Sequence, residues 1–148
     1  VLQVPLQVID SFLQLAVLCQ QVLQACLNTP KLVLVASDSG QLLLRQLTAI
    51  KGVGIKTARL VLLFGLRRPI FVVDTHVHRV SKRLGLIPTG CGRDRAHHLL
   101  DELVPDRQKY AGHMNMIQHG RRVCKARTPL CPGCPLDPWC LHVRGALL

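Results

Sequence analysis

The sequence is poor in aromatic and acidic residues. Phe, Tyr and Trp make up only 3% of its 148 residues. A row of aromatic side chains on which nucleic-acid bases stack is therefore excluded as the main binding device. Only 8 acidic residues stand against 19 lysines and arginines, so the formal net charge is +11. This imbalance favours a polyanionic partner over a basic surface that merely keeps the protein soluble.

The positive charge is concentrated after residue 44. Residues 1–44 carry one base and two acids, whereas residues 45–148 carry 18 bases and 6 acids. We therefore expect any nucleic-acid surface to lie from Arg45 onward. The longest apolar run, at residues 11–27, is interrupted by four glutamines. It predicts a buried amphipathic helix and no membrane partner.

The hydrophobic periodicity predicts an all-α fold. Asp74 is a good N-cap and Gly85 a good C′ residue for one helix, and Gly120 is expected to close the last long helix. Residues 32–36 are ambiguous between a strand and a buried helix turn, and residues 70–73 form a short extended apolar run. Helices are expected at residues 11–27, 41–50, 53–64, 75–84, 93–103 and 107–119.

Two of the expected helices are joined by the loop Lys51-Gly52-Val53-Gly54. The glycines permit a tight hairpin, and the first N–H groups of the second helix have no helical partner and are able to bind an anion. A plain helix–helix turn is the alternative interpretation. The basic surroundings favour phosphate binding, for which the candidate residues are Gly52, Val53, Gly54 and Thr57.

Lys56 stands near the positive end of the second helix. This position, together with partial burial, disfavours the ammonium form. A lysine with a neutral amine is able to attack a sugar C1′ and form a Schiff base. The alternative is that Lys56 only contacts a phosphate, and the residue alone leaves both roles open.

The expected position of Asp74 bears on the choice between these two roles of Lys56. The helix at 53–64 leads about 14 Å away from Lys56, and the residues 66–73 span up to about 26 Å when extended, which is enough to return. Asp74 is therefore expected beside Lys56, as an N-cap whose carboxylate faces a developing positive charge. A purely structural N-cap is the alternative, and the two roles are compatible.

Four of the seven cysteines crowd into 17 residues: Cys124, Cys131, Cys134 and Cys140. This clustering favours a metal site in a reducing compartment over two disulfides. Tetrathiolate sites hold zinc or an iron–sulfur cluster. Structural zinc more often uses two C-x2-C pairs, and only one is present here. The wider gaps favour an iron–sulfur cluster, with zinc left open.

Together these motifs resemble the endonuclease III family of DNA glycosylases. The runs Ile50–Ala58 and Val73–Val80 are similar to the family's helix-hairpin-helix and to its Gly/Pro-rich loop with an aspartate. The cysteine spacing, with the preceding His119-Gly120-Arg121, is similar to the family's iron–sulfur loop. The resemblance implies that Lys56 and Asp74 are catalytic and that the four cysteines bind a 4Fe–4S cluster.

The resemblance also implies a function in base-excision repair. Lysine at position 56 is similar to the branch that is both DNA glycosylase and apurinic/apyrimidinic lyase. Such an enzyme acts as a monomer on double-stranded DNA, removes a damaged base such as an oxidised pyrimidine, and cleaves the abasic site by β-elimination through a lysine Schiff base. The resemblance places Lys125 and Arg127 on backbone phosphates. It implies the nucleoid-associated cytoplasm of a bacterium or archaeon, or a eukaryotic nucleus or mitochondrion.

The resemblance covers residues 42–140 and implies three parts. They are a poorly matched N-terminal helical segment at 1–40, a helix-hairpin-helix core at 41–120, and a cluster loop and tail at 121–148. Much of the family's N-terminal helical region is expected to be missing, and a chain that starts at Val1 fits a fragment or a processed form. The alternative function is a non-catalytic DNA-binding module or an inactive fragment, and a zinc-stapled interaction protein is a third.

Overall fold

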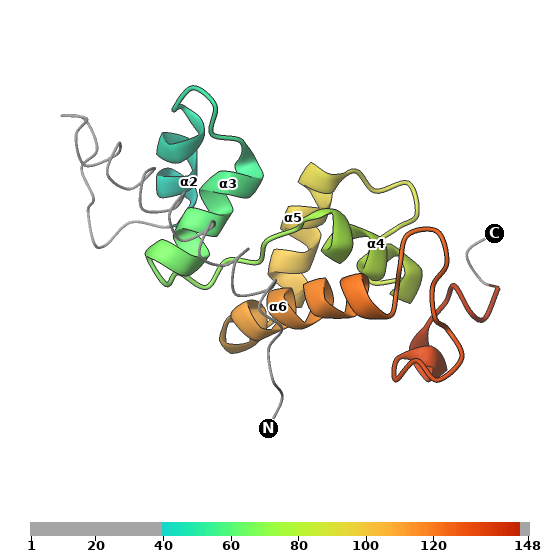
Figure 1. Ribbon diagram of the computed structural model, residues 1–148. Coiled ribbons are helices and arrows are strands. Elements are labelled where there is room, and N and C mark those ends of the chain that lie inside the picture. The colour runs from blue at the N-terminus through green and yellow to red at the C-terminus, as the bar shows by residue number, and fades with distance from the viewer. Residues whose placement is uncertain (1–39, 146–148) are drawn as a thin grey trace. The chain divides into compact units, whose positions relative to one another are not determined.

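The computed structural model describes residues 40–145, within which every regular element is a helix (Figure 1). The predicted all-α fold is therefore confirmed. The helix predicted at 11–27 and the ambiguous run at 32–36 lie outside the described residues. Over the described part of the chain, no helix is both long and apolar enough to span a lipid bilayer.

The chain divides between Arg68 and Pro69 into two compact units. The helices of the first are α2 (Gly40–Thr48), α3 (Ile55–Leu60) and the π-helical turn η1 (Val61–Gly65). The single helix predicted at 53–64 thus starts later, after the hairpin loop, and widens halfway along. The widening is visible in the bond from the Leu66 N–H to the Val61 carbonyl, five residues back, at 3.1 Å.

The apolar face of α2 packs on α3 and η1. Leu43 and Leu47, one turn apart, are both buried on this face. On the facing elements the buried apolar residues are Ala58, Leu60, Val61, Leu62 and Leu63. Because the two helices pack on each other, the loop between them is held at both ends.

The second unit contains α4 (Thr75–Leu84), α5 (Arg93–Leu103), α6 (Asp106–Arg122) and the short 3₁₀ turn η2 (Asp137–Trp139). The predicted caps of α4 are confirmed: a carboxylate oxygen of Asp74 accepts from the Val77 N–H at 2.7 Å, and Gly85 has φ +82°. A side chain at position 85 would also overlap Leu141, so the C-terminal loop packs closely against the end of α4.

The core of the second unit forms around the extended run that precedes α4. Phe71 and Val73 from this run are fully buried. They pack with residues of α4, of α5 and of the loop between these helices, namely Val77, Ile87, Cys91, Ala96 and Leu100. The extended conformation predicted for residues 70–73 is confirmed, and the run is part of neither a helix nor a strand.

Gly120 does not end the last long helix, as the sequence predicted, because α6 continues to Arg122. Its role is close packing of α6 against α4, its neighbour in Figure 1. A Cβ atom at position 120 would lie 2.9 Å from the Cβ of His76 and 3.4 Å from Nη2 of Arg79. Glycine is therefore required at position 120 because α4 and α6 approach closely there, and not because the helix ends there.

Gly120→Ala should destabilise the protein by about 1–3 kcal/mol, because the added methyl overpacks the contact between α4 and α6. In an uncrowded helix the same change would stabilise it, by up to about 1 kcal/mol. Chemical denaturation measures the difference. Gly90→Ala is the matched control, since its Cβ meets nothing within 4 Å, and it should change the free energy of unfolding by less than about 0.5 kcal/mol. An unchanged or raised stability for Gly120→Ala would contradict this packing.

Candidate functional site

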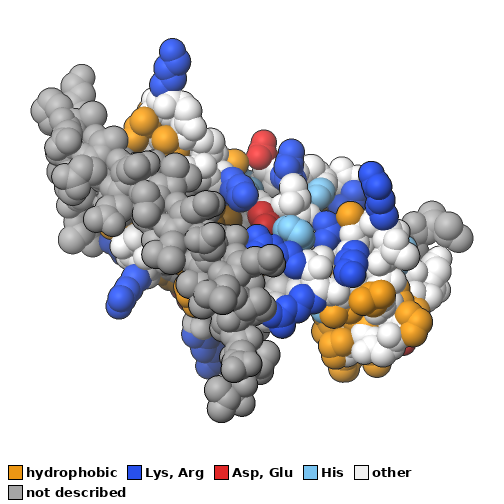
Figure 2. All heavy atoms as spheres, viewed as in Figure 1, with side chains coloured by type: hydrophobic (Ala, Val, Ile, Leu, Met, Phe, Trp, Pro, Cys, Tyr) orange, Lys and Arg blue, Asp and Glu red, His pale blue; other side chains and the backbone are white. Residues whose placement is uncertain are grey.

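Basic side chains outnumber acidic ones in both units. Residues 40–68 carry six bases and no acid, and residues 69–148 carry 12 bases and 6 acids. Figure 2 shows lysine, arginine and histidine side chains gathered over the viewed face of the second unit. An apolar patch lies over the C-terminal loop, where Leu130 and Trp139 are exposed. The excess of positive charge thus lies in residues 40–148, which include all of the predicted site residues.

The hairpin between α2 and α3 is tight and open to solvent. The Val53 N–H donates to the Ile50 carbonyl at 3.0 Å, and Gly52 adopts φ +89°, which glycine tolerates best. Gly54 is the N-cap of α3 with φ −83°, a conformation open to any residue. A Cβ at either glycine would meet nothing within 4 Å, so the backbone here is accessible to a ligand.

Lys56 is the second residue of α3 and its side chain is exposed. The partial burial expected from the sequence is therefore wrong within this unit, and the position at the helix start is confirmed. The first intrahelical bond of α3 runs from the Ala58 N–H to the Gly54 carbonyl at 3.0 Å. The N–H groups that precede Ala58 in α3, including those of Lys56 and Thr57, therefore have no acceptor within the helix.

Asp74 lies at the start of α4 with its side chain 8% exposed. Its backbone is extended, with φ −97° and ψ −174°, so the chain turns abruptly from the buried run 70–73 into the helix. The bond to the Val77 N–H fixes one carboxylate oxygen. The structural role predicted for Asp74 is confirmed, and its catalytic role stays a prediction.

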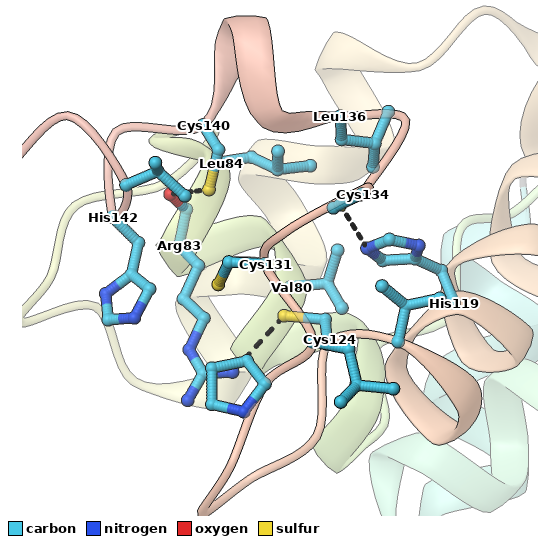
Figure 3. Close-up of a pocket in the computed structure, with 14 residues that line it drawn as sticks. Val80, Arg83, Leu84, His119, Cys124, Cys131, Cys134, Leu136, Cys140 and His142 are labelled. Carbon is cyan, nitrogen blue, oxygen red and sulfur yellow. Dashed lines mark hydrogen bonds between the residues drawn. The ribbon is translucent and has the colours of Figure 1, made fainter.

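The four clustered cysteines line one pocket of the second unit (Figure 3). The space left among the lining side chains is small, about 20 Å³, and partly open to solvent. All four thiols are free, so the two disulfides weighed as an alternative are not formed. The apolar part of the lining comes from Val80, Leu84, Val123, Pro129, Leu130, Leu136 and Val143.

The donor set fits a thiolate-bound cluster. Four soft sulfur donors on one partly apolar pocket suit iron–sulfur or zinc chemistry. Within residues 40–145, no group of three or more His, Cys, Asp and Glu side chains is gathered tightly enough to hold a single metal ion. Binding of a metal or cluster by these cysteines stays a prediction.

Lys125 and Arg127 are exposed on the loop between the first two cysteines. The Lys125 N–H donates to the Val123 carbonyl at 2.8 Å, and the Leu130 N–H donates to the same carbonyl at 2.9 Å. These bonds close the loop at its base, so that both basic side chains project from a compact turn. Their contact with phosphates stays a prediction.

Comparison with known proteins shows the family. No family model matches the chain. The chain is 40% identical over 101 residues to the endonuclease III of Thermotoga maritima, which covers 68% of this chain and 47% of that relative. It is 38% identical over 94 residues to the Escherichia coli endonuclease III, covering 64% of this chain and 44% of the relative.

Two solved structures agree with these relatives. A trapped endonuclease III–DNA covalent intermediate matches with a TM-score of 0.65 and 36% identity, over 71% of this chain and 49% of that one. A non-covalent endonuclease III–DNA complex matches with a TM-score of 0.64 and 36% identity, over 70% and 49%. The chain belongs to the endonuclease III family. It spans about half the length of the curated relatives it matches.

Two arginines of α4 that sequence reasoning missed hold the cysteine loop of this endonuclease III family member. Arg83 donates from Nη1 to the Cys124 sulfur at 3.2 Å (Figure 3). It also donates from Nη1 to the Lys125 carbonyl at 2.7 Å and from Nη2 to the Ala126 carbonyl at 2.9 Å. Arg79 donates to the Cys124 carbonyl at 3.0 Å. Their spacing of four residues on one helix face was the available signal.

His119 is a further residue of the pocket wall. Its Nε2 lies 3.8 Å from the Cys134 sulfur (Figure 3). Burial lowers the pKa of His119 below its ordinary value, so the ring is neutral at physiological pH. A neutral ring beside the cysteines adds no charge to the pocket.

Arg83→Gln should loosen the loop that carries Lys125 and Arg127, because three hydrogen bonds of the guanidinium are lost. A loss of roughly 1 kcal/mol in local stability raises the population of the open loop about fivefold. Limited trypsin digestion measures this as faster cleavage after Lys125 and Arg127. Lys82→Gln removes one positive charge from the same helix turn and serves as the control. Equal cleavage rates in the two variants would show that Arg83 does not hold the loop.

Proposed function

We propose that this chain is a DNA base-excision enzyme, a glycosylase with apurinic/apyrimidinic lyase activity. The observation that supports it most is an exposed lysine at the start of the second hairpin helix, in a chain about 40% identical to endonuclease III. One of the similar structures is described as a trapped covalent intermediate with DNA. Covalent chemistry by a lysine amine is consistent with that description.

In this proposal Lys56 is the nucleophile. Its neutral amine attacks C1′ of the damaged nucleotide, and the bond between C1′ and the base breaks with the electron pair leaving on the base. The sugar ring then opens to a Schiff base, which permits loss of a C2′ proton and departure of the 3′-phosphate. Asp74 stabilises the positive charge that develops on the sugar while the base departs.

We propose double-stranded DNA with damaged or abasic sites as the substrate and an oxidised pyrimidine as the base removed. The damaged nucleotide is extruded from the duplex so that the amine reaches C1′. The backbone at Gly52, Val53, Gly54 and Thr57 binds phosphates from the hairpin, as do Lys125 and Arg127 from the cysteine loop. The protein acts as a monomer in the compartment that holds the DNA: nucleoid-associated cytoplasm, nucleus or mitochondrion.

We further propose that Cys124, Cys131, Cys134 and Cys140 hold a 4Fe–4S cluster. When bound, the cluster acts as a structural staple for the loop and takes no part in base removal. The residues of the chain do the positioning: Arg83 donates to the Cys124 sulfur and to two carbonyls of the loop. The basic side chains of the loop thereby gain a rigid support.

Borohydride trapping on DNA with an abasic site tests the nucleophile. Wild-type protein should give a covalent adduct with DNA, because reduction converts the Schiff base to a stable amine. Lys56→Ala should lose the adduct, and Lys51→Ala, five residues earlier in the same hairpin, should retain it. Wild-type protein that binds DNA without forming an adduct or cleaving it would be a binding module and would contradict the proposal.

Colour and metal content test the cluster. Anaerobically purified protein should be yellow-brown and contain about four irons per chain. Cys134→Ser should lose most of the colour. Cys91→Ser, which removes a buried free thiol outside the pocket, should keep it. A colourless protein with one zinc per chain would overturn the iron–sulfur assignment.

The salt dependence of binding tests the loop contacts. Each neutralised phosphate contributes about −0.9 to the slope of log K against log salt concentration. Lys125→Ala with Arg127→Ala should therefore flatten the slope by about 1.8 if each side chain neutralises one phosphate. The control pair Arg93→Ala and Arg95→Ala removes the same charge from the start of α5 and should change the slope less. A wild-type slope in the loop variant would remove this loop from the DNA surface.

A further inference from the structure

The run before Asp74 is buried although it belongs to no helix or strand. Its residues Phe71, Val72 and Val73 are each 0–1% exposed, so their backbone groups cannot rely on water. Polar side chains of α5 and α6 supply partners instead. The Phe71 N–H donates to a carboxylate oxygen of Asp101, a residue of α5, at 2.6 Å.

Two buried histidines bond to the residues immediately before Asp74. The Val73 N–H donates to Nδ1 of His97 at 3.2 Å. Nδ1 of His113 lies 2.9 Å from the Val72 carbonyl oxygen. His97 is 1% and His113 2% exposed, so neither bond competes with bulk solvent. The ring of His113 also packs edge-on against Phe71, with centroids 6.5 Å apart.

The backbone partners dictate opposite proton positions on the two rings. An N–H group only donates, so Nδ1 of His97 carries no proton and the neutral ring is protonated at Nε2. A carbonyl only accepts, so Nδ1 of His113 carries a proton. The two rings therefore hold the peptide between Val72 and Val73 from both sides, one as acceptor and the other as donor.

A third buried side chain, Lys109, also binds the segment before Asp74 to α5 and α6. Lys109 donates to the Pro69 carbonyl at 3.2 Å and pairs with Asp101 at 3.1 Å and Asp106 at 2.8 Å. Burial opposes the charge on this lysine, but the hydrogen bonds and charges of Asp106 and Asp101 outweigh it and raise the Lys109 pKa. Lys109 therefore stays charged at neutral pH and ties the start of the run to α5 and α6.

Asp74 sits between two fixed points. The peptide before it is held by the histidines, and its carboxylate is held by the Val77 N–H. Residues 70–73 form no ladder with a strand, so their backbone is held by side chains. A shift of the peptide would therefore move the carboxylate along with the start of α4.

We propose that His97 and His113 are positioning residues for Asp74, which set where its carboxylate stands by holding the Val72–Val73 peptide. The catalytic consequence rests on the function proposed above. In this proposal the histidines act on Asp74 through the backbone and touch no reacting atom. An effect on the chemical step with little effect on DNA binding is the signature expected of such residues.

Substitutions by asparagine and leucine separate hydrogen bonding from shape. Asn offers an oxygen and an NH₂ group near the position of Nδ1, whereas Leu has a similar size and neither. His97→Leu and His113→Leu should each lower the single-turnover rate of abasic-site cleavage about 10- to 100-fold, because catalysis is sensitive to displacements near 1 Å. The Kd for abasic DNA should change less than about twofold, since no DNA contact is removed. His97→Asn and His113→Asn should recover most of the rate.

Spectroscopy tests the positioning without any reaction. In protein labelled with ¹⁵N-histidine, Nδ1 of His97 should be unprotonated and Nδ1 of His113 protonated. Amide hydrogen exchange at Val73 should accelerate in His97→Leu and return towards the wild-type rate in His97→Asn. The exchange of Val77 reports whether the bond to Asp74 is disturbed as well.

The outcomes separate this proposal from the proposed function. If wild-type protein cleaves abasic DNA and the Leu variants cleave equally fast, the histidines do not position Asp74 and the proposed function stands. If wild-type protein shows no cleavage, the proposed function fails. Amide hydrogen exchange at Val73 and Val77 in the His97→Leu variant then still tests whether His97 positions Asp74. Unchanged exchange at both amides, or a protonated Nδ1 on His97, would overturn the proposal that the histidines position Asp74.

Discussion

The second unit depends on burying an extended segment that no sheet supports. Phe71 and Val73 form the centre of its core, so the segment has to pass through the interior. Its backbone polar groups must then be satisfied by side chains, because buried unpaired groups are costly. The partners come from α5 and α6, so the core, the start of α4 and the position of Asp74 are determined together.

The same helix connects Asp74 to the cysteine loop. α4 begins at the Asp74 cap, lies against α6 at Gly120 and carries Arg79 and Arg83 towards the loop. Arg79 bonds both the Gly120 carbonyl at 2.8 Å and the Cys124 carbonyl at 3.0 Å. The helix that packs on α6 therefore also holds Cys124, the first of the four clustered cysteines.

Features that depend on neighbouring residues were predictable from the sequence, and those that depend on distant ones were not. The Asp74 cap and the Gly85 end of α4 follow from local hydrogen bonds and from a positive φ, and both are confirmed. Gly120 was misassigned because its crowding comes from His76, 44 positions away. The bonds of Arg83 to the loop were missed for the same reason. All four clustered cysteines line one pocket, and the metal site that their spacing suggests stays a prediction.

Locating the trapped adduct within the chain tests the central claim most directly. The chain contains six lysines, at positions 31, 51, 56, 82, 109 and 125. After borohydride reduction on abasic DNA, nuclease and protease digestion followed by mass spectrometry identifies the lysine that carries the sugar remnant. Our account predicts the modification on Lys56 alone. An adduct on Lys51 or on any other lysine would contradict it, because the exposed amine at the start of α3 would then not be the nucleophile.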